Sequence, residues 1–360
     1  MSDENKKKLN EQLIRYVLDD KLSNDKKLKR MDYIIRLGAD INAECGLGFS
    51  VLSLAKMMQN DDVISFLEEK GAKYTDFNKE KAEKFFKKAS VEEINRALKV
   101  LPDGYKLDCD VDLRERDLTE LPDFSRVVVN GNFNCGGNQL VSLEGAPREV
   151  AGYYYCYENK LTTLEGAPSV VGGDFNCYDN RLTTLSGAPR EVGGLFYCSH
   201  NKLISLEGVP SKVGGDFNCY DNMLISLRGV PSEVKGNFDC SHNKLTSLEG
   251  APSKVRRHFD CSYNQLDSLR GAPSVVGGDF NCYDNRLTTL RGTPRVVGGD
   301  FVCQYNQLDS LEGAPRYVGQ NFDCDHNPIK SYRGKPNRIG GKFIAPDIEV
   351  VGSRNGGIDR

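Results

Sequence analysis

A strong net charge and long apolar runs are both missing from this sequence. Its 360 residues include 48 Lys and Arg against 51 Asp and Glu, a formal net charge of −3. A charge so close to zero gives no overall preference for nucleic acid or for an anionic membrane. The longest apolar runs are much shorter than a membrane span, and the opening residues, MSDENKKK, lack the apolar core of a signal peptide. We therefore expect a protein of the cytoplasm.

Recognisable catalytic motifs are missing too. The sequence has no phosphate-binding Gly-Lys-Ser/Thr loop, no Gly-x-Ser-x-Gly elbow and no His-Glu-x-x-His zinc motif. The recurring Gly-Gly-Asp-Phe segments do not form a dinucleotide fingerprint, because no helix is expected after them. We expect no enzyme activity, no cofactor and no metal site, and no catalytic residue is assigned.

The sequence does contain ten cysteines at one unbroken spacing of 21 residues. A fixed period of this length predicts a solenoid, in which each unit buries its apolar side against its neighbours. In parallel strands about 4.8 Å apart the thiols come within disulfide range. No neighbouring group would lower the pKa of a thiol, so we expect the column to be buried, reduced and structural. The column consists of Cys135, Cys156, Cys177, Cys198, Cys219, Cys240, Cys261, Cys282, Cys303 and Cys324.

Each repeat reads Phe-x-Cys-x-x-Asn-x-Leu-x-x-Leu-x-Gly-x-Pro-x-x-Val-x-Gly-x. Phe175 and Cys177 are two residues apart, so in a strand both point into the solenoid. Asn180 follows where the strand must turn, and a stacked column of such amides can hydrogen-bond the backbone of neighbouring turns. The rest of each core layer comes from Leu182, Leu185 and Val192, and the return is broken by Gly187 and Pro189.

This pattern resembles the leucine-rich repeat, whose Leu-x-x-Leu-x-Leu-x-x-Asn-x-Leu strand motif maps onto Phe175, Cys177, Asn180 and Leu182. The resemblance covers roughly residues 107 to 345 and is closest to the compact repeats of bacterial effector proteins. Phe and Cys replace two leucines, and each repeat has one added residue. Some of those effectors carry a ligase domain with a catalytic Cys, for which this sequence has no counterpart. The resemblance implies a parallel-β solenoid that binds proteins, with a cytoplasm or a host cytoplasm as its place of action.

The first third of the sequence differs in character, because it is rich in Lys and helical in period. Gly38-Ala-Asp-Ile-Asn-Ala43 recurs 33 residues later as Gly71-Ala-Lys-Tyr-Thr, with Ser50-Val-Leu-Ser-Leu-Ala55 between them. This segment resembles an ankyrin repeat, without the Pro and His of the usual signature. Residues 79 to 99 predict two short helices, the second opened by a capping box at Ser90-Val-Glu-Glu93, which would cover the first edge of the solenoid.

We divide the chain into a helical, ankyrin-like region and cap at 1–104, a leucine-rich-repeat-like solenoid at 105–352 and a flexible tail at 353–360. Both ends of the array depart from the consensus, as solenoid ends do. Leu107, Cys109, Leu118 and Leu121 indicate a degenerate first repeat, and Phe343 with Ala345 a last one. Ile348, Val350 and Val351 predict a final strand on the open edge.

The positions that point outward carry the functional signal. Counted from each of the ten cysteines spaced 21 residues apart (the ladder cysteines), they are positions −3, −1, +1 and +2, which gives 40 positions in ten repeats. None holds Lys or Arg, although 48 such residues in 360 predict about five by chance. Twelve are acidic, nine are Tyr, and all four His of the chain are among them. From these we predict a partner-binding site made of Tyr157, Asp174, Tyr178, Asp179, Tyr197, His200, Asp216, Tyr220, Asp221, Asp239, His242, Asp260, Tyr263, Asp279, Tyr283, Asp284, Asp300 and Tyr305.

The favoured function is a non-enzymatic scaffold that binds a basic protein surface or peptide on an acidic, Tyr-rich concave face. Column +4, with Lys160, Arg181, Lys202, Lys244 and Arg286, would give this face a basic border. By resemblance to effectors, the partner belongs to a host or a defence system. A simpler explanation is duplication of residues tolerated on an exposed sheet, since Asp-Phe-Asn-Cys-Tyr-Asp-Asn recurs at 174, 216 and 279.

Two other functions stay open. One is a nucleic-acid mimic that blocks a DNA- or RNA-binding protein; direct binding of nucleic acid or of a membrane is not expected. The other is an enzyme with a carboxylate pair such as Asp279 and Asp300. The histidines are poorly spaced for a zinc site.

Overall fold

The computed structural model describes residues 2–347. The chain divides into two compact units, Met1–Phe175 with Gly187–Pro189 and Asn176–Ser186 with Arg190–Arg360. The predicted strand at Ile348, Val350 and Val351 and the predicted tail at 353–360 lie outside the described residues.

The first unit begins with six helices, as the Lys-rich composition and helical period predict. Ser50, Asn60 and Asn78 each begin a helix by accepting a backbone N–H with the side chain. The capping box predicted at Ser90 and Glu93 is present and begins the sixth. The helices are α1 (Asp3–Leu18), α2 (Asn24–Arg36), α3 (Val51–Met57), α4 (Asp61–Glu69), α5 (Lys79–Lys88) and α6 (Val91–Leu98).

Helices α1 and α2 pack together, as do α3 and α4. The start of α3 is held by hydroxyl groups: Ser50 Oγ donates to the carbonyl of Lys73 at 2.8 Å, and Ser53 Oγ donates to the carbonyl of Thr75 at 2.6 Å. The recurring Gly38 and Gly71 follow α2 and α4 at positive φ, 103° and 80°. The predicted helical character is confirmed, while the ankyrin assignment stays a prediction.

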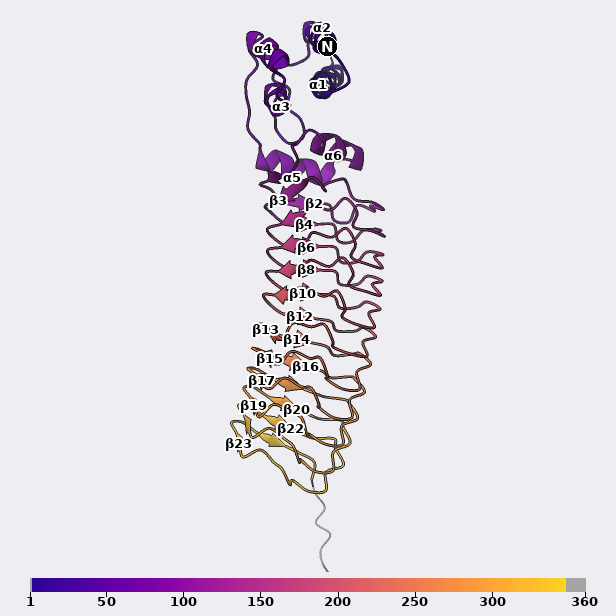
Figure 1. Ribbon diagram of the computed structural model, residues 1–360, viewed down its shortest axis with the longest axis vertical. Helices are drawn as coiled ribbons and strands as arrows, with labels where there is room; N and C mark the ends of the chain where they lie inside the picture. Colours follow the sequence, from indigo (N-terminus) through magenta and orange to yellow (C-terminus); the bar gives the residue numbers. More distant parts are fainter. Residues whose placement is uncertain (1, 348–360) are drawn as a thin grey trace, which may run out of the picture. The chain divides into compact units, whose positions relative to one another are not determined.

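From residue 105 on the chain forms a parallel β-solenoid with the predicted 21-residue turn, and each turn contributes two very short strands (Figure 1). The strands that carry Phe and the outward positions form the face sheet: β2 (Val111–Asp112), β4 (Phe133–Asn134), β6 (Tyr154–Tyr155), β8 (Phe175–Asn176), β10 (Phe196–Tyr197), β12 (Phe217–Asn218), β14 (Phe238–Asp239), β16 (Phe259–Asp260), β18 (Phe280–Asn281), β20 (Phe301–Val302), β22 (Phe322–Asp323) and β24 (Phe343–Ile344).

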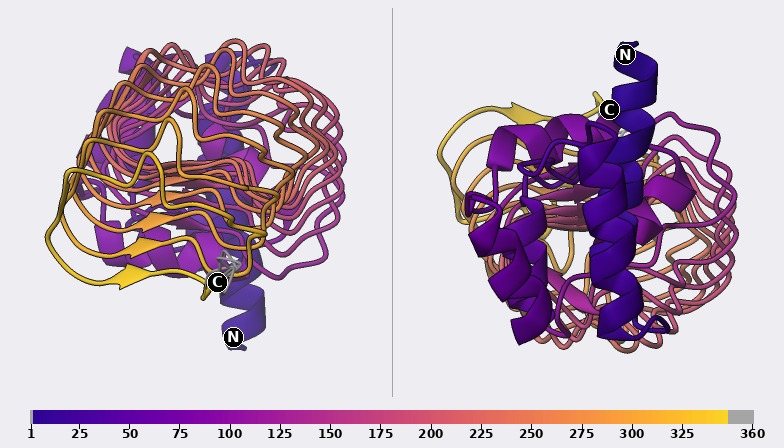
Figure 2. Two further views of the ribbon diagram at one scale, coloured as in Figure 1. Left: turned by 90° about the horizontal axis from the view of Figure 1, so that it is seen from below. Right: turned by 90° about the horizontal axis from the view of Figure 1, so that it is seen from above.

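The second strand of each turn ends on the consensus Val. In the first unit these are β1 (Tyr105–Leu107), β3 (Val127–Val129), β5 (Glu149–Val150) and β7 (Val170–Val171); in the second they are β9 (Glu191–Val192), β11 (Lys212–Val213), β13 (Glu233–Val234), β15 (Lys254–Val255), β17 (Val275–Val276), β19 (Val296–Val297), β21 (Tyr317–Val318) and β23 (Arg338–Ile339). Successive turns pair in parallel with equivalent residues opposite, for example Phe238 with Phe259. Figure 2 (left) looks along the stack, and the orange and yellow turns of the second unit overlie one another.

The inward residues build one repeating core. In the second unit Phe238, Phe259 and Phe280 are fully buried, and their ring centroids lie 5.5 and 5.2 Å apart. Buried thiols of this core face a carbonyl of the next turn; the Cys240 Sγ lies 3.3 Å from the Asp260 oxygen and the Cys261 Sγ 3.3 Å from the Asn281 oxygen. All twelve cysteines are free and the ten of the ladder are buried, which confirms their structural role. Burial raises the pKa of the Cys135 thiol to about 12 and raises the pKa of the Cys240 thiol well above its ordinary value.

The column of Asn side chains joins neighbouring turns as predicted. Asn243 Nδ2 donates to the carbonyls of Cys240 and Ser241 in its own turn and of Cys219 in the preceding turn, each at 3.1 Å. Its Oδ1 accepts the Leu224 N–H at 2.9 Å. Four backbone groups that the bend of the chain leaves unpaired are therefore satisfied by one amide.

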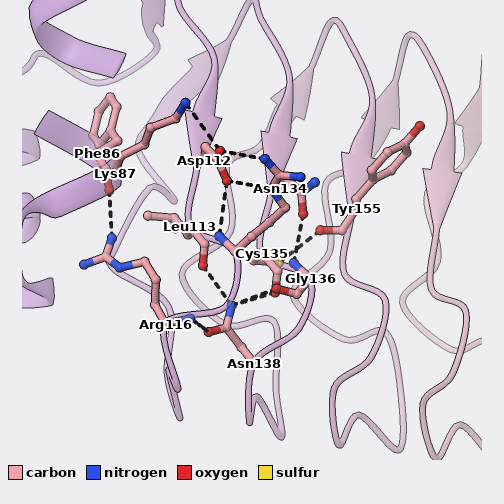
Figure 3. Close-up of polar contacts among 11 residues, drawn as sticks. Phe86, Lys87, Asp112, Leu113, Arg116, Asn134, Cys135, Gly136, Asn138 and Tyr155 are labelled. Carbon is pink, nitrogen blue, oxygen red and sulfur yellow. Dashed lines mark hydrogen bonds and ion pairs between the residues drawn. The ribbon is translucent and has the colours of Figure 1, made fainter. Parts of the chain in front are cut away.

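In the first turn of the solenoid an Arg takes the place of the Asn in this column and contacts helix α5. Val111 pairs with Phe133, which puts Leu113 in the cysteine position and Arg116 in the Asn position. Arg116 Nη1 donates to the Phe86 carbonyl at 2.7 Å (Figure 3). Its Nη2 donates to the Ala89 carbonyl. The guanidinium thus satisfies carbonyls at the end of α5 that have no helical partner.

The same helix extends the aromatic core. Its Phe86 ring lies 5.6 Å from Phe124, which lies 5.2 Å from Phe133. Residues 105 to 124 form a turn of the solenoid, with Leu107, Cys109 and Leu121 buried and Leu118 half-buried. The sequence did not indicate the role of Leu113 and Arg116, because neither matches the consensus.

Candidate binding surface

The predicted site residues lie on the outward side of the face sheet, and three of their four columns have a structural role that sequence analysis missed. Tyr157 and Asp174 belong to the first unit, and the other sixteen belong to the second. Each of these three columns holds the backbone in a different way.

Column −3 satisfies the backbone of the following turn. Asp216 Oδ1 accepts the Asn237 N–H at 2.8 Å, Asp279 Oδ1 accepts the Asp300 N–H at 2.8 Å, and Asp300 Oδ1 accepts the Asn321 N–H at 2.7 Å. Asn237 plays the same part with its amide oxygen. Short side chains with an acceptor oxygen are therefore favoured here whether or not a partner binds.

Column −1 holds the backbone within its own turn. Asp239 Oδ1 accepts both the Ser241 N–H at 2.9 Å and the Ser241 hydroxyl at 2.5 Å. Asp260 and Ser262 repeat this pair, and Asn218 accepts the Tyr220 N–H at 2.9 Å. These are Asx-type turns that end the strand. Partial burial raises the pKa of Asp239 above its ordinary value.

Column +2 is left-handed in every turn. In the second unit its φ angles run from 48° at Asp179 to 55° at His326. Asp and His are enriched in this conformation, so Asp179, Asp221 and His200 suit the backbone itself. Tyr has no such preference. In the second unit Tyr263 and Tyr305, at φ 51° and 52°, are therefore the residues of this column that backbone geometry does not explain.

Columns +1 and +2 together form a continuous line of rings. Every turn from Cys177 to Cys324 carries one aromatic ring at one of the two positions, and neighbouring centroids lie 4.1 to 5.2 Å apart. We call this the aromatic ladder; it consists of Tyr178, His200, Tyr220, His242, Tyr263, Tyr283, Tyr305 and His326. Tyr263 and Tyr305 are 42% and 44% exposed, so the ladder is a surface feature.

Several ladder rings are fixed by polar neighbours. His200 Nδ1 lies 2.8 Å from the Asp221 carboxylate and His326 Nδ1 lies 3.2 Å from Asp325. A hydrogen bond with Tyr263 raises the pKa of the Tyr283 hydroxyl. Such contacts hold the rings in place before any partner arrives, which lowers the entropic cost of binding.

Tyr157 and Asp174 lie in an aromatic cluster of the first unit. Tyr153 stacks on Tyr155 at 4.1 Å, and the Tyr155 and Tyr157 centroids are 6.2 Å apart. Asp174 lies 3.4 Å from the Tyr155 hydroxyl.

Basic side chains appear on this face at the first turn. Arg114 donates two hydrogen bonds to Asp112, at 2.9 and 3.0 Å. Lys87 Nζ lies 3.7 Å from the same carboxylate (Figure 3). The stretch without Lys or Arg therefore begins after this turn.

The carboxylate pair considered as an alternative site takes part in hydrogen bonds of the fold. Asp279 and Asp300 lie on successive turns, but the Asp279 carboxylate accepts the Asp300 N–H and faces His258 Nδ1 at 2.9 Å. Within residues 2–347, no three His, Cys, Asp or Glu side chains are placed to hold a metal ion. Nor does any helix in that range have the length and apolarity to cross a membrane.

The sequence matches no family model and no curated protein. Among solved structures the chain is similar to YopM from Yersinia enterocolitica WA-314, at 19% identity and a TM-score of 0.35, over 66% of this chain and 64% of that chain. It is also similar to YopM, a leucine-rich effector protein from Yersinia pestis, at 16% identity and a TM-score of 0.41, over 66% of this chain and 88% of that chain. The chain thus spans under two thirds of the first of these. The parallel register and Asn column described above identify the fold as a leucine-rich-repeat-like solenoid.

Proposed function

We propose that the chain is a non-enzymatic protein-binding scaffold, and that the aromatic ladder of its second unit binds a basic surface or peptide of a protein partner. One observation carries this proposal: eight successive turns each present one ring, and none of their outward positions holds Lys or Arg. Tyr offers a large contact area at low entropic cost. By resemblance of the repeat to those of bacterial effectors, the expected partner belongs to a host or a defence system.

The Asp side chains of the different columns differ in how far they are used by the fold and how far they are available to a partner. Asp216, Asp279 and Asp300 each use one oxygen on the backbone. The second oxygen of Asp216 accepts from Asn237 Nδ2 at 3.1 Å and that of Asp279 faces His258 Nδ1 at 2.9 Å, so these carboxylates contribute mainly their negative charge. Asp221 and Asp284 in column +2 are on the surface and lie beside ladder rings. A negative wall with rigid rings selects positively charged partners and repels phosphates.

The other two functions receive less support. A nucleic-acid mimic needs carboxylates that are free to stand in for phosphates, whereas carboxylates of columns −3 and −1 accept hydrogen bonds from backbone N–H groups. The proposed carboxylate pair, Asp279 and Asp300, is likewise occupied by hydrogen bonds of the fold.

The test is a ladder variant that leaves the backbone contacts intact. Tyr220→Ala, Tyr263→Ala and Tyr305→Ala together remove three rings, and none of these side chains caps a backbone group. With a partner isolated by affinity capture and then purified, we expect calorimetry to show at least about a hundredfold weaker binding. A control with Thr246→Ala and Thr288→Ala, on the exposed loop side, should bind like wild type.

Equal binding by the ladder variant would contradict the proposal. Displacement of the partner by duplex DNA would instead favour mimicry.

A further inference from the structure

Two successive turns of the second unit carry apolar side chains at positions where the other turns of that unit are polar or small. Position +6, counted from the ladder cysteine, holds Thr183 and Thr246 on the flanking turns but Ile204 and Ile225 between them. Both isoleucines are exposed, by 56% and 65%. On the same two turns position +11 is Val209 and Val230, where Ala188, Ala251 and Ala272 stand on neighbouring turns.

These isoleucines border a groove. It has a volume of about 400 Å³, and its lining includes Ile204, Ile225, Ser226, Glu207 and Arg228. Exposed Ile is costly unless it is covered, because burying such a side chain contributes about 1.5–3 kcal/mol. The groove lies on the loop side of the turns and is separate from the aromatic ladder.

Of the three charged residues that line the groove, Glu249 pairs with Arg270, whereas Glu207 and Arg228 make no ion pair within residues 2–347. Glu207 and Arg228 both stand at position +9, on successive turns. Elsewhere in this column neighbouring charges do pair: Arg270 with Glu249 at 3.1 Å and Arg333 with Glu312 at 2.9 Å. The Ile204 and Ile225 turns thus present one free carboxylate and one free guanidinium.

We propose that this surface, the Ile patch (Ile204, Glu207, Ile225 and Arg228), binds a second copy of the chain around a two-fold axis. An isologous contact requires a patch that is complementary to itself. An axis that runs parallel to the strands, midway between the two turns, reverses the order of turns in the second copy. Ile204 then faces Ile225 of the second copy, and Glu207 faces Arg228 of the second copy.

The arrangement of charge selects this occupant and this orientation. With the turns in the same order, Glu207 would face Glu207 and Arg228 would face Arg228, which is repulsive. With the order of turns reversed, Glu207 of each copy faces Arg228 of the other and the apolar residues pack together, so the dimer forms two ion pairs. The interaction is independent of the aromatic ladder, which stays open in the dimer.

The first experiment removes the apolar contact. Ile204→Thr with Ile225→Thr gives both turns the residue of their neighbours, so the fold should be kept. Sedimentation equilibrium of the full chain should show a concentration-dependent wild-type dimer and at least about tenfold weaker association of the variant. A wild type that stays monomeric up to about 200 μM, where even a weak dimer of Kd near 100 μM would be visible, overturns the proposal.

The second experiment tests the orientation by exchanging the charges. Glu207→Arg and Arg228→Glu should each weaken association about tenfold or more, while the double variant should recover to within about threefold of wild type. Arg333→Glu, in the same column outside the patch, is the matched control and should leave association unchanged. A double variant as weak as either single one contradicts the two-fold pairing.

Discussion

The two sides of the face sheet in the second unit obey different rules although they share the same strands. The inward side repeats Phe and Cys in every turn from Cys177 to Cys324. The outward side varies: at position −1, for example, different turns hold Tyr197, Asn218, Asp239 and Val302. Inside, each side chain meets a copy of itself, so one shape serves every turn. Outside, Asn and Asp satisfy the same backbone group equally well, so the sequence is free to vary.

The largest difference between the two sides should appear on removing a ring. Phe238→Ala opens a cavity between two stacked neighbours and should lower the free energy of unfolding by about 3–5 kcal/mol. Tyr220→Ala, from the neighbouring turn but on the outward side, should cost about 1 kcal/mol or less. Denaturant unfolding followed by circular dichroism measures both, and similar losses would mean that the ladder is part of the core.

A smaller difference is expected between two Asn columns. Asn243→Ala leaves three carbonyls and the Leu224 N–H without the amide and should cost about 2–4 kcal/mol. Asn237→Ala on the outward side loses the Nδ2 bond to Asp216 and the bond from the His258 N–H and should cost about 1 kcal/mol. If Asn237→Ala were the more damaging change in thermal unfolding, the Asn243 column would not be what joins the turns.

The smallest effect concerns the pH dependence of stability. Burial raises the pKa of Asp239 above that of an unfolded Asp, about 3.9, so the folded protein holds this proton more tightly. The contribution of this residue is then fully favourable below about pH 4 and is lost as the pH rises through the raised pKa. Asp239→Asn should remove this loss, about 1 kcal/mol or less, so its stability relative to wild type should rise with pH.

Asn218 shows that an amide caps this turn equally well, and the exposed Asp267→Asn is the matched control. A stability difference between Asp239→Asn and wild type that stays constant from pH 3 to pH 7 would contradict the assignment.

The repeat allowed most of the fold to be predicted and less of the site. Periodicity alone predicted the inward Phe and Cys and the role of Asn in joining turns, because those residues contact the equivalent residues or backbone of neighbouring turns. It did not give Arg116, whose partners on helix α5 are set by tertiary packing.

For the site, composition found the acidic and aromatic positions but not why they occur. The Asp216 side chain binds a backbone N–H of the next turn, and the φ angle of Asp179 is left-handed; neither is visible in one repeat. The ladder could have been found by noting one ring per turn at +1 or +2. The Ile patch could have been found from the two departures at +6.

The aromatic ladder also has a consequence for how this protein can change over generations. Because each 21-residue turn brings one ring and its own backbone caps, duplication or loss of a turn lengthens or shortens the ladder by one ring at unchanged spacing. The length of the aromatic surface therefore changes in steps of one turn. Homologues that recognise longer or shorter ligands could arise by unequal recombination within the gene, without a single substitution in the core.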